Sequence, residues 1–152
     1  RPGIGIYGVD ANGKNIIINN KRLTFPVKLK CPILQVRNVN KGAKVSYNGL
    51  SRLTRNSRLA TIGIGYADGI LRSLRKQINV NISGIDCKVV GAITMDSIIV
   101  DITDLNNYPI KVGDYVNLIN KNNFFTNFIK NSNVNIYELF TLFSNRIIKN
   151  YK

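Results

Sequence analysis

Apolar and polar residues alternate, or form short apolar blocks, over residues 24–119 of this 152-residue chain. Such a pattern, interrupted by glycine, proline and asparagine, is typical of β-strands joined by turns. It predicts strands within 24–45, 59–64, 78–82, 85–90, 98–102 and 115–119. Ser83 and Gly84 form the turn of a predicted hairpin. Pro26 and Pro32 indicate strand starts or an edge, because proline cannot donate a ladder hydrogen bond.

The period changes near the C-terminus, where apolar residues recur at the three- and four-residue spacing of an amphipathic helix. These residues are Phe124, Phe125, Phe128, Ile129, Ile136, Leu139, Phe140 and Phe143. They predict one or two helices, the second capped by Asn133 or Asn135. Residues 1–9, apolar and glycine-containing, predict the last strand and turn of a preceding domain, followed by a polar loop over 10–20. The expected fold is a mainly β domain over 10–152.

Hydrophobic residues make up 44% of the chain and charged residues 20%, which favours a folded domain over disorder. No run approaches the ~18 apolar residues of a membrane-spanning helix, and no basic-then-apolar leader opens the chain. We therefore expect a cytoplasmic protein. Because the chain begins with Arg1 instead of methionine, we also expect it to be a piece of a longer protein.

The formal net charge of +14 is compatible with a nucleic-acid-binding module, since a basic face is the footprint of that activity. The lysines and arginines are scattered, however, and no nucleic-acid motif accompanies them. Abundant Lys, Asn and Ile would also follow from A/T-rich coding. Nucleic-acid binding is retained as an alternative, and the preferred interpretation has no nucleic-acid partner.

Cysteine and histidine usage limits the chemistry. Cys31 and Cys87 are far apart and form no CxxC pattern, so we expect buried or reduced thiols. The chain has no histidine, the commonest metal ligand and the side chain that titrates near neutral pH. The sequence predicts no metal site, and any catalysis has to use tyrosine, lysine, arginine or carboxylates.

The run IGIGYADGI places Tyr66 directly after an apolar strand and among glycines. We expect the backbone to turn sharply here with a positive φ at a glycine, which has no Cβ. The phenol then emerges at a strand end, where functional residues tend to lie.

Five segments follow one another in a specific order and spacing: RPGIGIYG at 1–8, VSYNG at 45–49, IGIGYADGI at 62–70, VGAITMD at 90–96 and NRIIKNY at 145–151. With them the chain resembles the C-terminal part of alanine racemase, a family that interconverts L- and D-alanine with pyridoxal phosphate. The resemblance implies a C-terminal β domain with one or two helices, preceded by the last strand of a (β/α)8 barrel that is otherwise missing. It also implies a homodimer.

The resemblance implies that Tyr47 is the catalytic tyrosine, contributed in trans to the cofactor of a partner subunit. Racemisation needs one group to take the Cα proton from one face and another to return it on the opposite face. In the family these groups are the tyrosine and a lysine on the barrel. Free tyrosine has a pKa of about 10, so the site has to favour the phenolate.

Further roles follow from the resemblance alone. Arg1 matches the partner of the cofactor ring nitrogen, and Gly3, Ile4 and Tyr151 match groups that meet its phosphate. The Met95 amide is implied to bind the substrate carboxylate. Tyr66 is implied to line a narrow entrance that favours alanine over larger side chains. Asp96 and Arg72 belong to that entrance.

Four positions depart from the family pattern: Asn48, Leu71, Ala92 and Ile148. Asparagine tolerates a positive φ, so the turn after Tyr47 is expected to survive. Nothing in the chain resembles the K-A-N-A-Y-G-type segment with the cofactor lysine, and the histidine that partners the tyrosine is absent too. The isolated chain is therefore expected to be inactive. A non-catalytic β domain for subunit contact remains an alternative, supported by Ala92 and Leu71.

Overall fold

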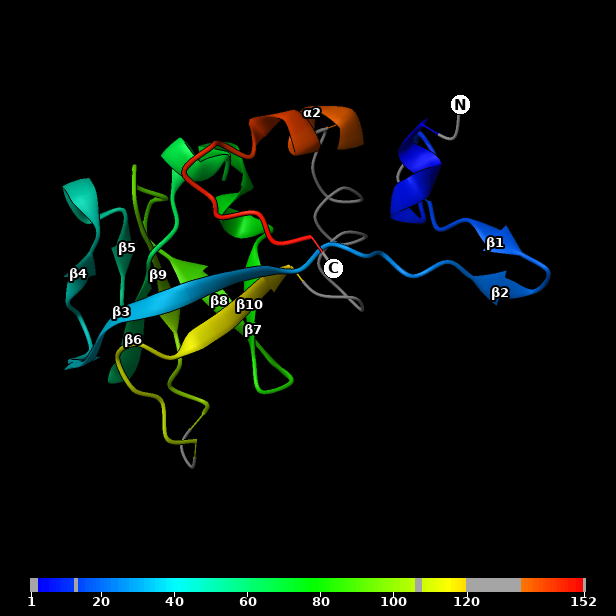
Figure 1. The fold of residues 1–152 in the computed structure, drawn as a ribbon. Coiled ribbons are helices and arrows are strands. Elements are labelled where there is room, and N and C mark those ends of the chain that lie inside the picture. The colour runs from blue at the N-terminus through cyan, green and yellow to red at the C-terminus, as the bar shows by residue number, and fades with distance from the viewer. Residues whose placement is uncertain (1–2, 13, 106–107, 120–134, 152) are drawn as a thin grey trace.

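The computed structural model describes residues 3–12, 14–105, 108–119 and 135–151, and within them a closed barrel of antiparallel strands forms the centre (Figure 1). The strand order is β10–β3–β6–β9–β8–β7, closed by pairing between β10 and β7. The strands are β3 (Leu29–Val39), β6 (Ser57–Ile62), β7 (Asn79–Ile82), β8 (Ile85–Val90), β9 (Ile98–Asp101) and β10 (Tyr115–Ile119). The mainly β fold class predicted from the sequence is confirmed.

The barrel core follows from the period-two alternation of side chains along each strand. Buried and less buried residues alternate through β7 and β9, and the fully buried side chains include Ala60, Ile62, Val80, Ile98 and Val100. The apolar residues whose alternation predicted these strands therefore fill the interior of the barrel.

The two cysteines belong to this core, and both are free and buried. Burial, with a smaller contribution from Asp68, raises the pKa of Cys31 to about 12. Burial also raises the pKa of Cys87 to about 11, helped by nearby carboxylates. Both thiols are therefore protonated at neutral pH, and the expectation of buried, reduced cysteines is confirmed.

Pro32 lies inside β3, so the prediction that it marks a strand start or an edge is wrong. Residues 29–32 of β3 pair with β10, whereas residues 33–39 pair with β6. Pro32 stands where the strand changes partner, and its carbonyl accepts a hydrogen bond from the Gly63 amide at 2.9 Å. The missing amide hydrogen is tolerated at this junction because the pairing with β6 begins one residue later.

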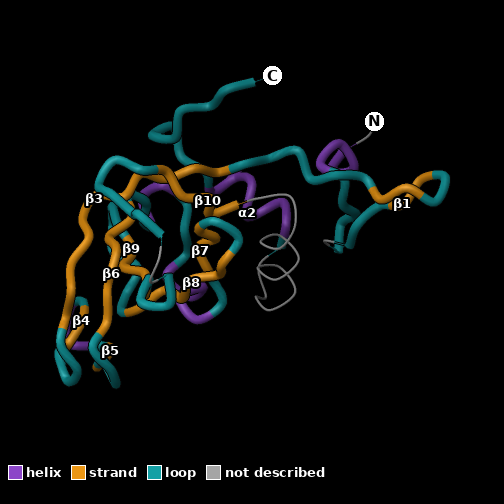
Figure 2. Tube along the Cα trace, turned by 90° about the horizontal axis from the view of Figure 1, so that it is seen from below, coloured by secondary structure: helices purple, strands orange, loops and turns teal. Residues whose placement is uncertain are grey.

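Two β-hairpins lie in regions for which the sequence made a prediction. Between β7 and β8, Ser83 and Gly84 both have positive φ, 53° and 88°, as the predicted two-residue turn requires. A second hairpin, β1 (Ile17–Ile18) with β2 (Lys21–Arg22), occupies the region predicted as a polar loop. In Figures 1 and 2 this hairpin extends away from the barrel.

The N-terminal segment differs from the strand expected over residues 1–9. The described part forms a 3-10 helix, η1 (Gly3–Tyr7), which begins with Gly3 at a φ of 52°. Tyr7 stacks on Phe140 with ring centroids 4.2 Å apart, and Val9 is buried in the main core. The segment thus packs onto the β domain, and the division into 1–9 and 10–152 stays a prediction.

The helix α2 (Ile136–Leu142) confirms the second of the predicted C-terminal helices. Its N-cap is Asn135, whose side chain accepts a hydrogen bond from the Tyr137 amide at 2.9 Å. Ile136 and Leu139 bury its apolar face in the core. The helix predicted around 124–129 lies outside the described residues. None of the helices in the described ranges has the length and apolar character that crossing a membrane requires.

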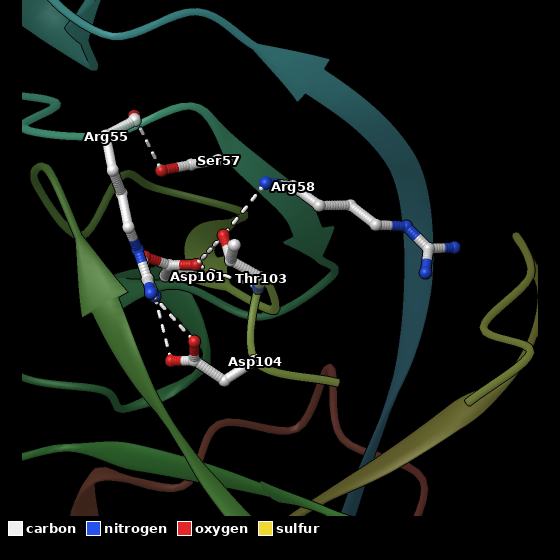
Figure 3. A network of polar contacts seen from close by, with 6 residues as sticks. All are labelled: Arg55, Ser57, Arg58, Asp101, Thr103 and Asp104. Carbon is white, nitrogen blue, oxygen red and sulfur yellow. Dashed lines mark hydrogen bonds and ion pairs between the residues drawn. The ribbon is translucent and has the colours of Figure 1, made fainter. Parts of the chain in front are cut away.

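A polar network fixes the start of β6 to the end of β9 (Figure 3). The Arg55 guanidinium donates two hydrogen bonds to the Asp104 carboxylate, at 2.7 and 2.8 Å, and also pairs with Asp101. The Thr103 hydroxyl bonds to Asp101 and accepts the Arg58 amide at 2.9 Å. Hydrogen bonding to Arg55 lowers the pKa of Asp104. This network links the segment before β6 to the segment after β9.

Candidate active site

Three connections meet at the end of the barrel opposite the Arg55 network. Residues 63–69 follow β6, residues 91–97 join β8 to β9, and the hairpin of β4 (Lys44–Val45) and β5 (Ser51–Arg52) carries residues 46–50 at its tip. The register pairs Ile62 with Ile98 and Val90 with Ile99, so the first two connections are neighbours. The predicted residues Tyr47, Tyr66 and Met95 therefore come together at one end of the barrel.

Tyr47 begins the short 3-10 helix η2 (Tyr47–Gly49) at the hairpin tip, the coil above β4 and β5 in Figure 1. Asn48 has a φ of 58° and Gly49 a φ of 60°, so the turn survives with asparagine after the tyrosine, as expected. The Tyr47 side chain is 75% exposed. The phenol is thus presented outward, and this chain leaves most of its surface uncovered.

Hydroxyl groups fasten the hairpin tip to the 91–97 connection. The Ser46 Oγ accepts a hydrogen bond from the Ala92 amide at 2.9 Å. The Ser51 Oγ accepts one from the Gly91 amide at 3.1 Å. A Cβ on Gly91 would lie 2.5 Å from the Ser46 Cβ, so glycine is required for this approach. The small residue Ala92, a departure from the family pattern, lies directly against the turn that carries Tyr47.

Tyr66 begins η3 (Tyr66–Asp68), which hydrogen-bonds along the other side of the same connection. The Tyr66 amide donates to the Thr94 carbonyl at 2.9 Å and the Ala67 amide to the Met95 carbonyl at 3.0 Å. These bonds hold the phenol of Tyr66 and the backbone of Met95 on adjacent segments. Among the described residues the Met95 amide donates no hydrogen bond, which leaves it available to a ligand.

The glycines around Tyr66 act in two different ways. Gly69 has a φ of 103°, as a left-handed turn requires. Gly65, however, is extended, with a φ of −148°. Its role is spatial, because a Cβ on Gly65 would lie 2.3 Å from the carbonyl oxygens of both Thr94 and Met95. The positive φ expected at a glycine of this run is therefore confirmed at Gly69.

An ion-pair bridge from the C-terminal segment joins both connections. The Arg146 Nη2 lies 2.6 Å from the Asp96 Oδ1, and its Nε lies 3.4 Å from the Asp68 Oδ1. The other Asp68 oxygen accepts the Gly65 amide at 2.9 Å. The hydrogen bond to Asp96, then the charge of Asp68, raises the pKa of Arg146. The sequence had identified Asp96 but missed Asp68 and Arg146, although all three lie in the matching segments.

The other predicted residues lie apart from this cluster. Arg72 begins the 3-10 helix η4 (Arg72–Lys76) and is exposed. Tyr151 is 91% exposed at the C-terminal end of the described chain. Gly3 and Ile4 lie in η1, which is at the opposite side of the molecule from β4 and β5 in both views (Figures 1 and 2). Arg1 lies outside the described residues.

Comparison with known proteins decides the family. The family model described as "Alanine racemase, C-terminal domain" matches residues 26–151, most of the chain. The chain is a member of this family. Alanine racemase from Brucella ovis is 33% identical over 160 residues, which is 99% of this chain and 40% of the relative. The chain thus spans about two fifths of the length of that curated relative.

Solved structures agree with this assignment. Alanine racemase from Bartonella henselae, with covalently bound pyridoxal phosphate, superposes with a TM-score of 0.83 at 39% identity. The match covers 95% of this chain and 39% of that one. The enzyme from Clostridium difficile, in complex with cycloserine, gives a TM-score of 0.72 at 36% identity over 79% of this chain and 32% of its own. The alanine racemase type of β domain is therefore shown by both sequence and fold.

Proposed function

We propose that this chain is the C-terminal part of a pyridoxal-phosphate-dependent alanine racemase and supplies Tyr47 to the cofactor of a partner subunit. Family membership carries the proposal, because the chain matches the C-terminal domain of that enzyme over residues 26–151. The rest of the enzyme, including the lysine that binds the cofactor, lies outside this chain. The chain alone is expected to be inactive.

The N-terminal residues fit the cofactor phosphate. Gly3 has a φ of 52°, with no atom within 4 Å of the position that its Cβ would take. The amides of Gly3 and Ile4 open a helix and so have no intrahelical carbonyl to bind. Tyr151 is a further phosphate ligand, and Arg1 is the proposed partner of the ring nitrogen. Pyridoxal phosphate, when bound, supplies the electron sink that makes the substrate Cα–H acidic.

The arrangement of the chain supports action between subunits. The β4–β5 hairpin, whose tip carries Tyr47, lies at one side of the molecule, and η1, with the proposed phosphate ligands Gly3 and Ile4, lies at the other (Figures 1 and 2). We therefore infer that the Tyr47 of one chain serves a phosphate held by the η1 of another chain. A second copy, placed head to tail, brings the two half-sites together, and the 75% exposure of Tyr47 fits a residue that another chain covers.

The remaining residues bind and select the substrate. The Met95 amide donates to the alanine carboxylate, and Tyr66 narrows the space beside it. Asp96 and Arg72 place charges at the entrance. Tyr47 holds or removes the proton at the substrate Cα on the face of L-alanine. Small substrates are favoured because the backbone hydrogen bonds between η3 and the 91–97 connection leave little freedom to widen this space.

The decisive experiment is Tyr47→Phe in the full-length protein with pyridoxal phosphate. We expect racemisation to fall by at least ~100-fold, the contribution of a positioned acid–base group. The enantiomers are equally stable, so kcat/KM has one value in both directions. The directional signature is therefore proton exchange: in D2O the variant should still exchange the Cα proton of D-alanine but not that of L-alanine.

The matched control is Tyr115→Phe, which removes the hydroxyl of an exposed tyrosine on β10. It should leave racemisation and Cα proton exchange unchanged. If Tyr47→Phe racemises alanine as fast as the unmodified enzyme, the catalytic assignment is wrong. Absence of racemase activity from the unmodified full-length protein would instead indicate a non-catalytic domain.

A further inference from the structure

The residue before Tyr47 has an unusual backbone. Ser46 has a φ of 71° and a ψ of 176°. This region is essentially restricted to glycine, because a Cβ there crowds the neighbouring backbone. A non-glycine residue keeps such a conformation only where its surroundings fix it, and such residues cluster at functional sites.

Two contacts of Ser46 fix it. Its Oγ accepts the Ala92 amide at 2.9 Å, and its Cβ occupies space left free by Gly91, where a second Cβ would lie only 2.5 Å away. Ser46 is half-buried, whereas Tyr47 is exposed. The hydroxyl therefore anchors the exposed tyrosine to the 91–97 connection, which also carries Met95.

We propose that Ser46 is a positioning residue for Tyr47, holding the peptide before the tyrosine in a strained orientation that aims the phenol at the substrate Cα. The proposal rests on the proposed function. This role accounts for the strained backbone, because misplacing a reacting group by ~1 Å can lower the reaction rate ~100-fold. The same hydrogen bond fixes the distance between the tyrosine turn and the segment that binds the substrate carboxylate.

The test compares Ser46→Ala, Ser46→Gly and Ser51→Ala in the full-length holoenzyme. Ser46→Ala removes the hydrogen bond and keeps the Cβ. Ser46→Gly also removes the bond but suits the observed backbone, so its folding is not impaired by strain. Ser51→Ala is the matched control, because it removes the same kind of hydrogen bond, from the amide of the adjacent residue Gly91 to a serine hydroxyl.

We expect both Ser46 variants to lower kcat by about tenfold or more with little change in KM, a loss set by misplacement of the phenol. Ser46→Gly should unfold at no lower temperature than Ser46→Ala. Ser51→Ala should keep the kcat of the unmodified enzyme. Exchange of the Cα proton in D2O should slow for L-alanine in the Ser46 variants and remain unchanged for D-alanine.

Combining Ser46→Ala with Tyr47→Phe separates this inference from the proposed function. If Ser46 acts through the phenol, the double variant loses no more activity than Tyr47→Phe alone. Three results would each overturn the positioning role. The first is that Ser46→Ala causes the same fractional loss of activity with Tyr47 present as with Tyr47→Phe. The others are a Ser51→Ala variant as impaired as Ser46→Ala, and an unaltered kcat in both Ser46 variants. A fully active Tyr47→Phe would overturn the proposed function itself.

Discussion

Gly65 and Gly69 shape the candidate entrance for different physical reasons. Gly69 is a backbone requirement, since its φ of 103° is a conformation that side chains disfavour. Gly65 is a packing requirement, since η3 approaches the 94–97 turn so closely that no Cβ fits between them. Both support the same feature, the close contact between the segment of Tyr66 and that of Met95.

Gly65→Ala should therefore separate these two segments. The new Cβ meets backbone oxygens 2.3 Å away, which cannot rotate aside, so we expect destabilisation of about 1–3 kcal/mol from overpacking. The KM for alanine should rise as well, because the Met95 amide shifts. Thermal unfolding and steady-state kinetics of the full-length protein measure both effects.

Gly63→Ala is the control for that substitution. The atoms nearest to its Cβ would be side-chain atoms of Leu34, at 3.2 and 3.3 Å, and that exposed side chain can move. The loss of stability should be clearly smaller than for Gly65→Ala. Equal losses from the two substitutions would contradict the close-approach argument.

At the scale of elements, the C-terminal segment after α2 is tied to the barrel end through Arg146. The arginine contacts Asp68 of η3 and Asp96 of the 94–97 turn, so one side chain links three segments. Ala92, one of the departures from the family pattern, offers no charge to Asp96. The cation that pairs with Asp96 is Arg146, fifty residues further along the chain.

Arg146→Met should loosen this link while keeping much of the apolar stem. We expect the KM for alanine to rise several-fold with a smaller effect on kcat, because the entrance shifts and Tyr47 does not. Raising the salt concentration should increase KM in the unmodified enzyme and have less effect in the variant, since the Arg146–Asp96 pair is half-exposed. Arg37→Met, an exposed residue on β3, is the control and should change neither constant. A variant with an unaltered KM would contradict the link.

Local signals in the sequence predicted most elements, and non-local contacts account for what they missed. The bounds of β8 and β10 follow from apolar alternation, and Asn135 from capping chemistry. The β1–β2 hairpin was missed although Asn19 and Asn20 both adopt the positive φ of its turn, 50° and 59°. Two-residue strands carry too little alternation to be distinguished from a loop.

The candidate site, like the fold, was predictable only in part. Motif resemblance identified Tyr47, Tyr66, Met95 and Asp96, which the fold brings to one end of the barrel. The Arg146 bridge and the strain at Ser46 were not predictable, because each depends on contacts between segments 46 to 78 residues apart. With 22 lysines and arginines in the chain, charge alone could not select the arginine that meets Asp96.

At the scale of the whole molecule, the proposed function divides the active site between two separated regions of the chain. The β4–β5 hairpin, whose tip carries Tyr47, lies at one side, and η1 with its proposed phosphate ligands lies at the other (Figure 1). Under the proposed function, a complete active site combines two subunits, each giving its tyrosine to the other. The consequence can be tested by mixing two inactive proteins.

We expect a full-length Tyr47→Phe variant and a full-length variant lacking the cofactor lysine to regain activity when they are unfolded together and reassembled. In a mixed dimer one site receives both substitutions and the other receives neither. Random association makes half of the dimers mixed, so about a quarter of the unmodified activity should return. Each variant treated alone should stay inactive. A mixture of Tyr115→Phe with the lysine variant is the control, in which every subunit keeps Tyr47. If Tyr47 acted on its own subunit, every site in the mixture would lack one group and no activity would return.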